Sequence, residues 1–593
     1  MPNRIHIGVC ALAAPAKNAP RTVQYSEYVH EMLGHAGLCC DPVAPGDLAA
    51  RLDSLRVLVT VGEQRFDDAL RARLTAWVTD EGGAWLSVGG LCGMEELLGA
   101  DYAPASFALW GGSLRALGEG FLDGGQSEHP VLRDLSPIPL HYFSGVAATA
   151  RPGAQVLASC LDAHHRPVEG RPALIENRAG RGRCLLIAPD VTGSVVRIQQ
   201  GTAITRDGVP SPDGTGPVSD GVLKSDDGQA LDWLLDRQPV PGVPGLSGFL
   251  QPVADQWRDL LLRSILHLAS EQGVPVSLLW YHPDNLPAVG HISHDSDGNG
   301  VDQAWGLLKT LERADIRSTW CIILPGYSPD IIAAIRDAGH ELATHYDSVT
   351  EGLEEFSEAQ FDRQWRLLCE QFGDEKPVTN KNHYLRWEGD VEFFQWCIAR
   401  GIRLDQTKGT SKSGEVGFNF GTCHPYRPTA PGGDVLPIHE LPTPTQDLRV
   451  FAPEEVVPAM LESVARHYGV LHLLFHPAHI DKPGVADSIV TAVRLGREKG
   501  LAWRTAREIV EWEEARRAAA WEGAAENGVS LKASRPLKGA TVLCLAPKSG
   551  QVRVNGAGAA ATERRWGFTF HAATLDLAAG AAATIEFIEE TTA

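Results

Sequence analysis

The sequence has no long apolar run, which argues against a membrane-spanning protein. It also has no paired cysteines, which argues against a disulfide-rich secreted protein. No stretch approaches the ~18 uninterrupted apolar residues of a membrane span. The 11 cysteines are odd in number and form no CxxC pair, which predicts buried free thiols in a reducing compartment. The segment 1–20 has one short apolar run, typical of a first strand and not of a signal peptide. We therefore expect a cytoplasmic protein.

An excess of positive charge is also lacking. Lys and Arg number 53 against 74 Asp and Glu, giving a formal charge of −21, which argues against nucleic-acid or anionic-membrane partners. The 61 Gly and 38 Pro are scattered without a period, which excludes a collagen-like chain. A length of 593 residues with 44% hydrophobic residues predicts a globular protein of two to four domains.

The first region alternates apolar strands with helices. Strands are expected at 5–12, 56–60 and 84–88, and helices at 24–36 and 67–79. This alternation predicts a doubly wound α/β domain with a parallel sheet covered on both faces. Further along, a strand at 183–188, helices at 231–236 and 257–270, and a long exposed loop at 201–228 are expected.

Four segments of this region stand out, namely RVLVTVGEQRFDD, LTAWVTDEGGAWLSVGG, EHPVL and WRDLLLRSILHLAS. In these segments the region is similar to the glutamine-amidotransferase-like domains of ThuA-type proteins and of the trimerisation domain of some β-galactosidases. The resemblance implies an accessory domain over 1–275 and a possible homo-oligomer formed through it. Cys92 lies a few residues past the position of a nucleophile elbow and no His–Glu pair follows, so we expect it to be a buried thiol without catalytic function.

The middle region, 276–515, repeats a β-α pattern that predicts a deformed β/α barrel with its site at the carboxyl ends of the strands. The expected strands are 288–293, 318–324, 340–345, 401–404, 471–475 and 501–503. The expected helices are 302–312, 330–338, 358–371, 390–399, 453–467 and 484–499. A charged helix over 508–525 would end this domain. The short alternating strands of 526–593 predict a small β-sandwich.

The segment HISHDSDGNG at 291–300 is the first candidate for chemistry. Asp295 and Asp297 would share one face of an extended strand, and two such close carboxylates repel unless one binds a cation or a proton. A solvated turn is the alternative, because Asp-Gly and Asn-Gly favour turns.

Further polar residues stand near the ends of later strands, and several together favour one site. They are His345, His383, Arg386, Asp405, His476 and His479. Each alone is more often a hydrogen-bonding residue of the surface or core than a ligand.

With these motifs in order, the middle region resembles the polysaccharide deacetylase family of metal-dependent carbohydrate esterases. The resemblance rests on Asp295 with Asp297, on IRSTWCIILPG, on DIIAAIRDAGHELATH and on Leu474 with His476. It implies a divalent metal, with zinc expected, bound by Asp297 and His345. It also implies Asp295 as the base that activates water, Arg386 as the residue that orients this base, and His476 as the acid.

Two departures leave the third ligand open. Val349 stands where such proteins typically carry a second histidine, and Ser296 separates the two aspartates. His383 is our first candidate, with Asp347 and His479 as alternatives.

The expected function is hydrolysis of an N-acetyl or O-acetyl group on a carbohydrate substrate. One alternative is a non-catalytic carbohydrate-binding or scaffold protein with a degenerate barrel. Another is hydrolysis of a non-sugar amide.

Overall fold

The computed structural model describes residues 5–12, 25–103, 108–109, 112–113, 116–208, 219–524, 528–547, 550–559 and 561–589. The chain divides into two compact units, and neither is continuous in sequence. The first comprises Met1–Val196, Gln256–Asn285 and Glu514–Ala593, and the second Arg197–Asp255 with Leu286–Glu513. The predicted domains 1–275, 276–515 and 526–593 follow chain order, whereas these units interleave. Within the described residues, no helix has the length and apolar character needed to cross a membrane.

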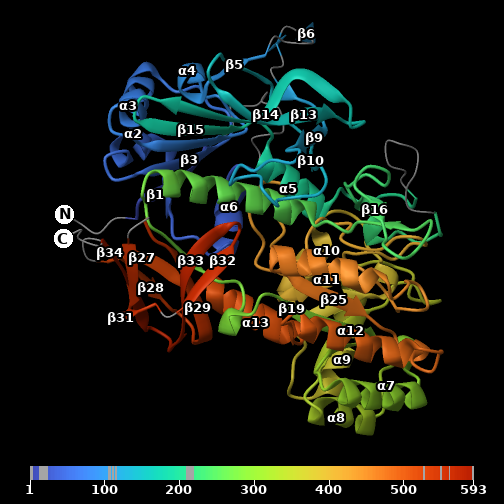
Figure 1. The fold of residues 1–593 in the computed structure, drawn as a ribbon. Helices are drawn as coiled ribbons and strands as arrows, with labels where there is room; N and C mark the ends of the chain where they lie inside the picture. The colour runs from blue at the N-terminus through green and yellow to red at the C-terminus, as the bar shows by residue number, and fades with distance from the viewer. Residues whose placement is uncertain are drawn as a thin grey trace. The chain divides into compact units, whose positions relative to one another are not determined.

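The first unit contains a nine-stranded mixed sheet (Figure 1). Five of its strands are parallel neighbours, in the order β2 (Asp41–Pro42), β1 (Ile7–Ala11), β3 (Val57–Val61), β4 (Ala84–Val88) and β15 (Gly182–Ile187). Antiparallel neighbours extend it through β14 (Pro167–Ala179), β13 (Gln155–Asp162), β9 (Gly120–Asp123) and β10 (Leu140–Tyr142). Every residue of β1, β3, β4 and β15 is buried, so this part of the sheet is covered on both faces.

Helices in this unit include α1 (Tyr28–His35), α2 (Leu48–Arg51), α3 (Asp68–Thr79), α4 (Glu95–Leu98), the first part of α5 (Val191–Gln200) and most of α6 (Val253–Glu271). Cys92 follows β4 with a φ of 56° and is wholly buried. Burial, and then the nearby carboxylate of Glu63, raise the pKa of its thiol. The thiol therefore stays protonated and unreactive.

The helix expected over 231–236 is wrong. The structure has a turn there, in which two carboxylates accept backbone N–H groups. The Asp232 carboxylate accepts the N–H groups of Leu234 and Leu235, at 2.8 and 2.9 Å. Asp236 in turn accepts the N–H of Asp232, at 2.7 Å.

The second unit is built on an eight-stranded parallel sheet that curves as a half-barrel, compatible with the predicted deformed barrel. Its order is β24 (His439–Glu440), β23 (Leu404–Asp405), β22 (Thr379–Asn382), β21 (Glu341–Tyr346), β20 (Thr319–Ile322), β19 (Val289–Asp295) and β25 (Val470–Leu474). An eighth strand, β26 (Ala502–Trp503), pairs with β19. Strands β20 and β21 are parallel neighbours, which confirms the expected adjacency of 318–324 and 340–345.

Amphipathic helices cover the outer face of this sheet (Figure 1). They are α7 (Val301–Ala314), α8 (Pro329–Asp337), α9 (Glu358–Phe372), α10 (Glu392–Ala399), α11 (Val456–His467) and α12 (Val485–Glu498). Leu307 and Leu311 of α7 and Ile331 and Ile335 of α8 repeat at the four-residue spacing of one helix face. They pack in one buried cluster with Trp320 of β20. The outward residues of the strands thus form the core, which leaves the inner face for polar side chains.

The helix expected over 508–525 is shorter in the structure than predicted. Helix α13 (Ala506–Arg517) ends early, and β27 (Ala520–Ala524) follows it and pairs with β28 (Gly528–Lys532). The guanidinium of Arg516 donates to the carbonyl oxygen of His35 at 2.8 Å, and Arg517 pairs with Glu31. The alanine-rich continuation favours helix locally, but its residues 520–524 are taken up by the pairing with β28.

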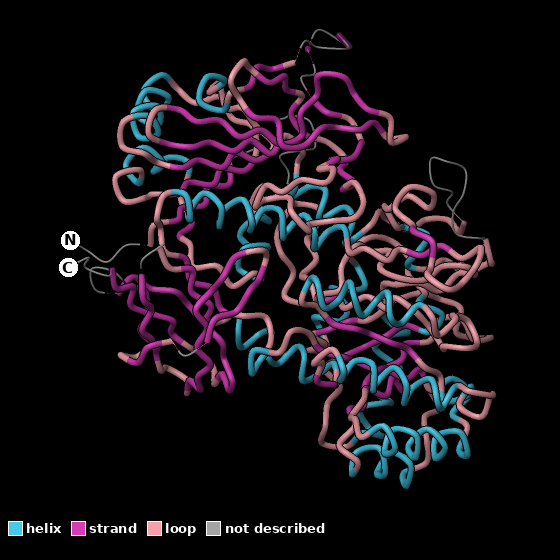
Figure 2. The backbone as a smooth tube through the Cα atoms, viewed as in Figure 1, coloured by secondary structure: helices cyan, strands magenta, loops and turns pink. Residues whose placement is uncertain are grey.

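Two antiparallel sheets complete the first unit (Figure 2). One is β18 (Val276–Leu279), β29 (Leu537–Leu545), β33 (Phe568–Leu577) and β32 (Ala561–Arg565). The other is β27, β28, β34 (Ala582–Glu589), β30 (Gly550–Val554) and β31 (Ala557–Gly558). Residues 276–279 fall within the predicted barrel region 276–515, but they form β18, which pairs with β29. That these sheets form a separate sandwich remains a prediction.

Candidate functional site

Polar side chains gather where the parallel strands of the second unit end. Asp295 is the last residue of β19, and Asp297 lies in the turn that follows. His345 is the penultimate residue of β21, His383 follows β22 directly, and His476 lies two residues beyond β25. Because carboxyl ends of parallel strands share one edge, segments far apart in sequence meet there.

The sequence had suggested that the two aspartates lie on one continuous strand. In the structure they do not. The strand ends at Asp295 and Ser296 turns the chain, with φ −82° and ψ 34°. The Ser296 hydroxyl accepts the N–H of Ile323 at 3.0 Å and donates to Asn299 at 3.0 Å. This turn delivers both carboxylates to one site, so the solvated-turn alternative was right about the local backbone.

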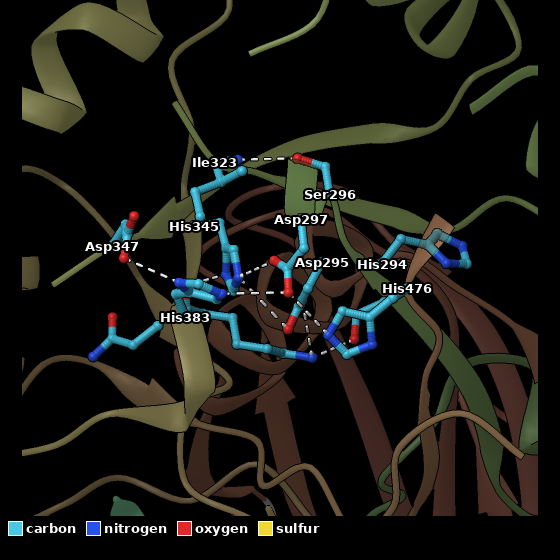
Figure 3. Close-up of polar contacts among 12 residues, drawn as sticks. His294, Asp295, Ser296, Asp297, Ile323, His345, Asp347, His383 and His476 are labelled. Atoms are coloured by element: carbon cyan, nitrogen blue, oxygen red, sulfur yellow. Dashed lines mark hydrogen bonds and ion pairs between the residues drawn. The ribbon is translucent and has the colours of Figure 1, made fainter. Parts of the chain in front are cut away.

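Three imidazoles surround the carboxylate of Asp297 (Figure 3). Nε2 of His345 lies 3.2 Å from Oδ1, and Nε2 of His383 and of His476 lie 3.3 and 3.5 Å from Oδ2. Asp297, His345 and His383 each offer a ligand atom, and these atoms lie within 4.8 Å of one another. His294 points away from this group and hydrogen-bonds the carbonyl oxygen of Phe475.

The outward nitrogen of each ring donates to an acceptor behind it, which determines its tautomer. The acceptors are the carbonyl oxygen of Lys381 for His345 (2.9 Å), Asp347 for His383 (3.0 Å) and Asp447 for His476. A neutral ring that donates from Nδ1 carries a lone pair on Nε2. If all three rings are neutral, three lone pairs face one carboxylate.

This donor set fits a divalent cation. Lone pairs and carboxylate oxygens repel at these distances unless a cation lies between them. Nε2 of His345 and Oδ1 of Asp297 are buried and have no hydrogen-bond partner among the described residues. Carboxylate and backbone acceptors behind ligating histidines are the usual support of such sites. One carboxylate and two imidazoles that leave a position open are typical of catalytic zinc.

The charges around Asp297 shift the pKa values of this group. Burial works to lower the pKa of His383, but hydrogen bonds to Asp297 and Asp347 outweigh it and raise the pKa to about 9. For Asp297, burial works to raise the pKa, but His345 and His383 hold it well below its usual range. The site thus stabilises an ionised Asp297 next to a positive charge. A bound metal ion would supply the same positive charge.

Asp295 lies on the other side of this group and is almost fully buried. Its Oδ2 is 3.9 Å from Nε2 of His345, and its Oδ1 is 3.7 Å from Nζ of Lys381. Lys381 is itself buried inside the barrel, where its ammonium donates to the hydroxyl of Ser293. The Lys381 side chain is therefore the basic group that lies beside Asp295 in the site.

Arg386 does not reach Asp295. Its guanidinium pairs with Glu388 and donates to the carbonyl oxygen of Ser348. Among the described residues, the cation next to Asp295 is Lys381. Lys381 therefore occupies the place beside Asp295 that was expected for Arg386, and the catalytic role of Arg386 stays a prediction.

The alternatives for the third ligand lie farther from the centre. Asp347 accepts from the outward nitrogen of His383, so it supports that ring. Nδ1 of His479 lies 3.2 Å from Oδ1 of Asp447, within a second group formed by Asp447, His476 and His479. Asp405 lies in a buried network with Asn380 and Thr407 instead of in the site.

Sequence reasoning missed Lys381 and Asp447, for different reasons. Lys381 lies in β22, whose sequence TNKN has the low β-propensity of Asn and Lys and was not expected to be a strand. Asp447 lies in an irregular segment between β24 and α11, where periodicity carries no signal. The one signal for Lys381 in the sequence was its position in a short polar segment between two predicted strand–helix units, where a further strand would fit.

A cavity of about 650 Å³ opens onto these groups. Asp295, Asp297, His476 and His479 line it, together with segments 410–415 and 450–452. Its volume lies within the ~300–1,000 Å³ range of small-molecule sites.

No family model and no curated protein matches this sequence. Among solved structures, the chain is similar to a candidate polysaccharide deacetylase from Mycobacterium smegmatis, with 16% identity, 40% of this chain and 94% of that chain covered, and a TM-score of 0.31. It is also similar to the chitin deacetylase of Colletotrichum lindemuthianum, with 16% identity, coverages of 38% and 89%, and a TM-score of 0.26. An exo-β-1,4-mannosidase from Opitutaceae bacterium strain TAV5 matches at 19% identity, coverages of 32% and 31%, and a TM-score of 0.23. Likenesses this low carry no argument, so the function is inferred from the side chains of the site.

Proposed function

We propose that this protein is a metal-dependent hydrolase that removes an N-acetyl, or O-acetyl, group from a carbohydrate. The observation that carries the proposal is the convergence of three tautomer-locked imidazoles on Asp297, with a second carboxylate, Asp295, beside them. Metal-assisted hydrolysis needs a ligand set with an open position and a separate base near it. Residues that could supply both lie together, and Asp295 and Asp297 among them line a substrate-sized cavity.

Asp297, His345 and His383 would hold the divalent cation, with zinc expected. A bound cation supplies Lewis-acid polarisation of the acyl oxygen and lowers the pKa of water beside it. Asp295 would accept the proton of the attacking water, and Lys381, whose Nζ lies 3.7 Å from its Oδ1, would hold this base in place.

His476 would protonate the leaving nitrogen. Its Nδ1 is bound to Asp447, so Nε2 faces the site. Water oxygen bonds to the acyl carbon, the carbon–nitrogen bond breaks, and acetate leaves while the amine takes a proton.

The proposal is tested by metal content and acetate release together. We expect the purified chain to bind about one divalent ion and to release acetate from neutral N-acetylated amino-sugar oligomers. Asp295→Asn should keep the metal and lose ~10²–10⁴-fold in turnover, because it removes only the base. A chain with neither metal nor acetate release would favour the non-catalytic carbohydrate-binding alternative.

The cellular setting is a separate proposal. All eleven cysteines are free thiols in the structure, which supports the expected cytoplasmic location because such thiols persist in reducing compartments. A homo-oligomer formed through the N-terminal region stays a prediction.

A further inference from the structure

A chain of hydrogen bonds lies on the inner face of the half-barrel, next to the candidate base Asp295. It runs from Nζ of Lys381 to the hydroxyl of Ser293 and from that hydroxyl to Nε2 of His472, at 2.9 Å. Nδ1 of His472 then contacts the carbonyl oxygen of Pro442 at 3.0 Å. Lys381, Ser293 and His472 are each at most 1% exposed, so none of them can bind substrate directly.

The chemistry of the groups fixes the direction of every bond in this chain. A carbonyl oxygen only accepts, so Nδ1 of His472 donates to Pro442. Burial, followed by the nearby Lys381 and His291, lowers the pKa of His472 well below its usual range. The ring is therefore neutral, and the lone pair on its Nε2 accepts the hydroxyl proton of Ser293. The Ser293 oxygen is left to accept an N–H of Lys381.

The ring of His472 is also held from the side. It packs against the ring of His291, with the two centroids 4.7 Å apart. Nδ1 of His291 lies 3.0 Å from the carbonyl oxygen of Arg504, and its Nε2 lies 2.8 Å from Oε1 of Gln406. Because a close-packed interior leaves little room for rotation, the barrel itself fixes the place of the acceptor that Ser293 offers to Lys381.

This acceptor determines where Nζ of Lys381 lies. A lysine side chain is long and flexible, and without an anchor it could bond Asp295 directly or turn away from it. In the structure Nζ bonds Ser293 and stays 3.7 Å from Oδ1 of Asp295, which is beyond hydrogen-bond distance. Among the described residues, Oδ1 has no hydrogen-bond partner. The chain thus keeps a basic group beside the carboxylate without a bond to this oxygen.

We propose that Ser293 and His472 are positioning residues, which act through Lys381 to hold the candidate base Asp295 in its working orientation. The inference rests on the proposed function and adds two residues to it that touch neither the substrate nor the metal ligands. If the two residues act only through Lys381, their loss matters only while Lys381 is present. A purely structural function would make the effects independent.

A double-mutant cycle on acetate release from an N-acetylated amino-sugar oligomer tests this dependence. Ser293→Ala should lower kcat about 10-fold, with KM within about twofold and the metal retained, because it misplaces a group beside the base. Lys381→Met should lower kcat about 10²-fold. The double variant should stay within about twofold of Lys381→Met, whereas independent effects would multiply to about 10³-fold.

Two variants of His472 test the chain at its other end. His472→Leu removes both bonds of the ring and should lower kcat about 10-fold. His472→Gln keeps a donor and an acceptor in one side chain and should recover most of that loss. Ser488→Ala is the matched control, because its hydroxyl is also buried and donates to the carbonyl oxygen of Val485 at 2.7 Å, on α12. Its kcat should equal that of the wild type.

Circular dichroism on heating shows which variants fold, and the His472 pair carries the test if Ser293→Ala does not. The inference is overturned if the wild-type chain is active but the losses of Ser293→Ala and Lys381→Met multiply. It is also overturned if Ser293→Ala keeps the wild-type kcat, or if His472→Gln and His472→Leu lose equally. A wild-type chain that binds metal but releases no acetate would instead refute the proposed function, and with it the base that these residues position.

Discussion

At the residue scale, the site depends on what stands behind each ligand. Asp347 behind His383 and a backbone carbonyl behind His345 turn both inner nitrogens toward Asp297. The same arrangement at His476, with Asp447 behind it, leaves that ring slightly farther from Asp297. Metal binding and proton transfer should therefore separate by residue.

We expect Asp297→Ala and His345→Ala to lose both the metal and turnover, because each removes one of three ligands. His476→Ala should keep the metal and lose about 10²-fold or more in kcat. Elemental analysis and acetate release on the same preparations measure both effects. Loss of metal from His476→Ala would make His476 a ligand instead of the acid.

The buried ammonium of Lys381 gives a second prediction at this scale. Lys381→Met keeps the volume but removes the charge 3.7 Å from Asp295, so turnover should fall about 10²-fold with metal retained. Arg386→Lys would be intermediate if Arg386 oriented the base, but its contacts to Glu388 and Ser348 predict a small effect. Steady-state kinetics of the two variants decide between them, and a larger loss for Arg386→Lys would restore the assignment made from sequence.

At the element scale, the segment between β24 and α11 joins two parts of the site. The carboxylate of Asp447 contacts the rings of His476 and His479. Its carbonyl oxygen accepts the N–H groups of Val450 and Phe451. Burial works to raise the pKa of Asp447, but His476 and His479 hold it at about 2. One buried residue thus supports the acid and one wall of the cavity.

Asp447→Asn should lower kcat about 10- to 100-fold while the metal stays bound, because His476 loses its ionised partner but Asp297, His345 and His383 are untouched. His479→Ala should have a smaller effect, since His479 contacts Asp447 at the cavity side. The comparison uses kcat and metal content of both variants. If His479→Ala abolishes turnover with metal retained while His476→Ala does little, the two histidines exchange roles.

At the scale of the whole molecule, the compact units defined by residue contacts do not follow the order of the chain. Residues 197–255 belong with the barrel unit, although they precede the predicted barrel boundary. The carboxylate of Asp255 accepts the hydroxyl of Thr422 and the N–H of Cys423, at 2.8 and 2.7 Å. That of Asp226 accepts the N–H groups of Ser411 and Lys412, each at 3.0 Å.

A fragment limited to 276–515 should therefore be unstable. It leaves these buried donors without acceptors, and each costs ~1–3 kcal/mol. We expect it to aggregate or to unfold far below the full chain, followed by circular dichroism on heating. In the full chain, Asp255→Ala should lower the unfolding temperature measurably. A fragment that melts at the temperature of the full chain would contradict the assignment of 197–255 to this unit.

The sequence by itself determined the strand–helix alternation and the positions of Asp295, Asp297, His345 and His476 near strand ends. Apolar periodicity is a local property, and parallel strands bring their carboxyl ends to one edge whatever the details of packing. The loop-borne parts of the site had no such periodicity.

Only the tertiary structure decided which groups pair. Strand β22 forms from a polar sequence because it lies between two established strands, and this places Lys381 beside Asp295. Arg386, five residues later, is drawn to Glu388 instead. Asp447 contacts His476, which is 29 residues later in the chain. Residues 197–255 belong to the second unit and residues 514–593 to the first, which chain order does not suggest. These outcomes depend on long-range burial and charge pairing, which no local pattern in the sequence encodes.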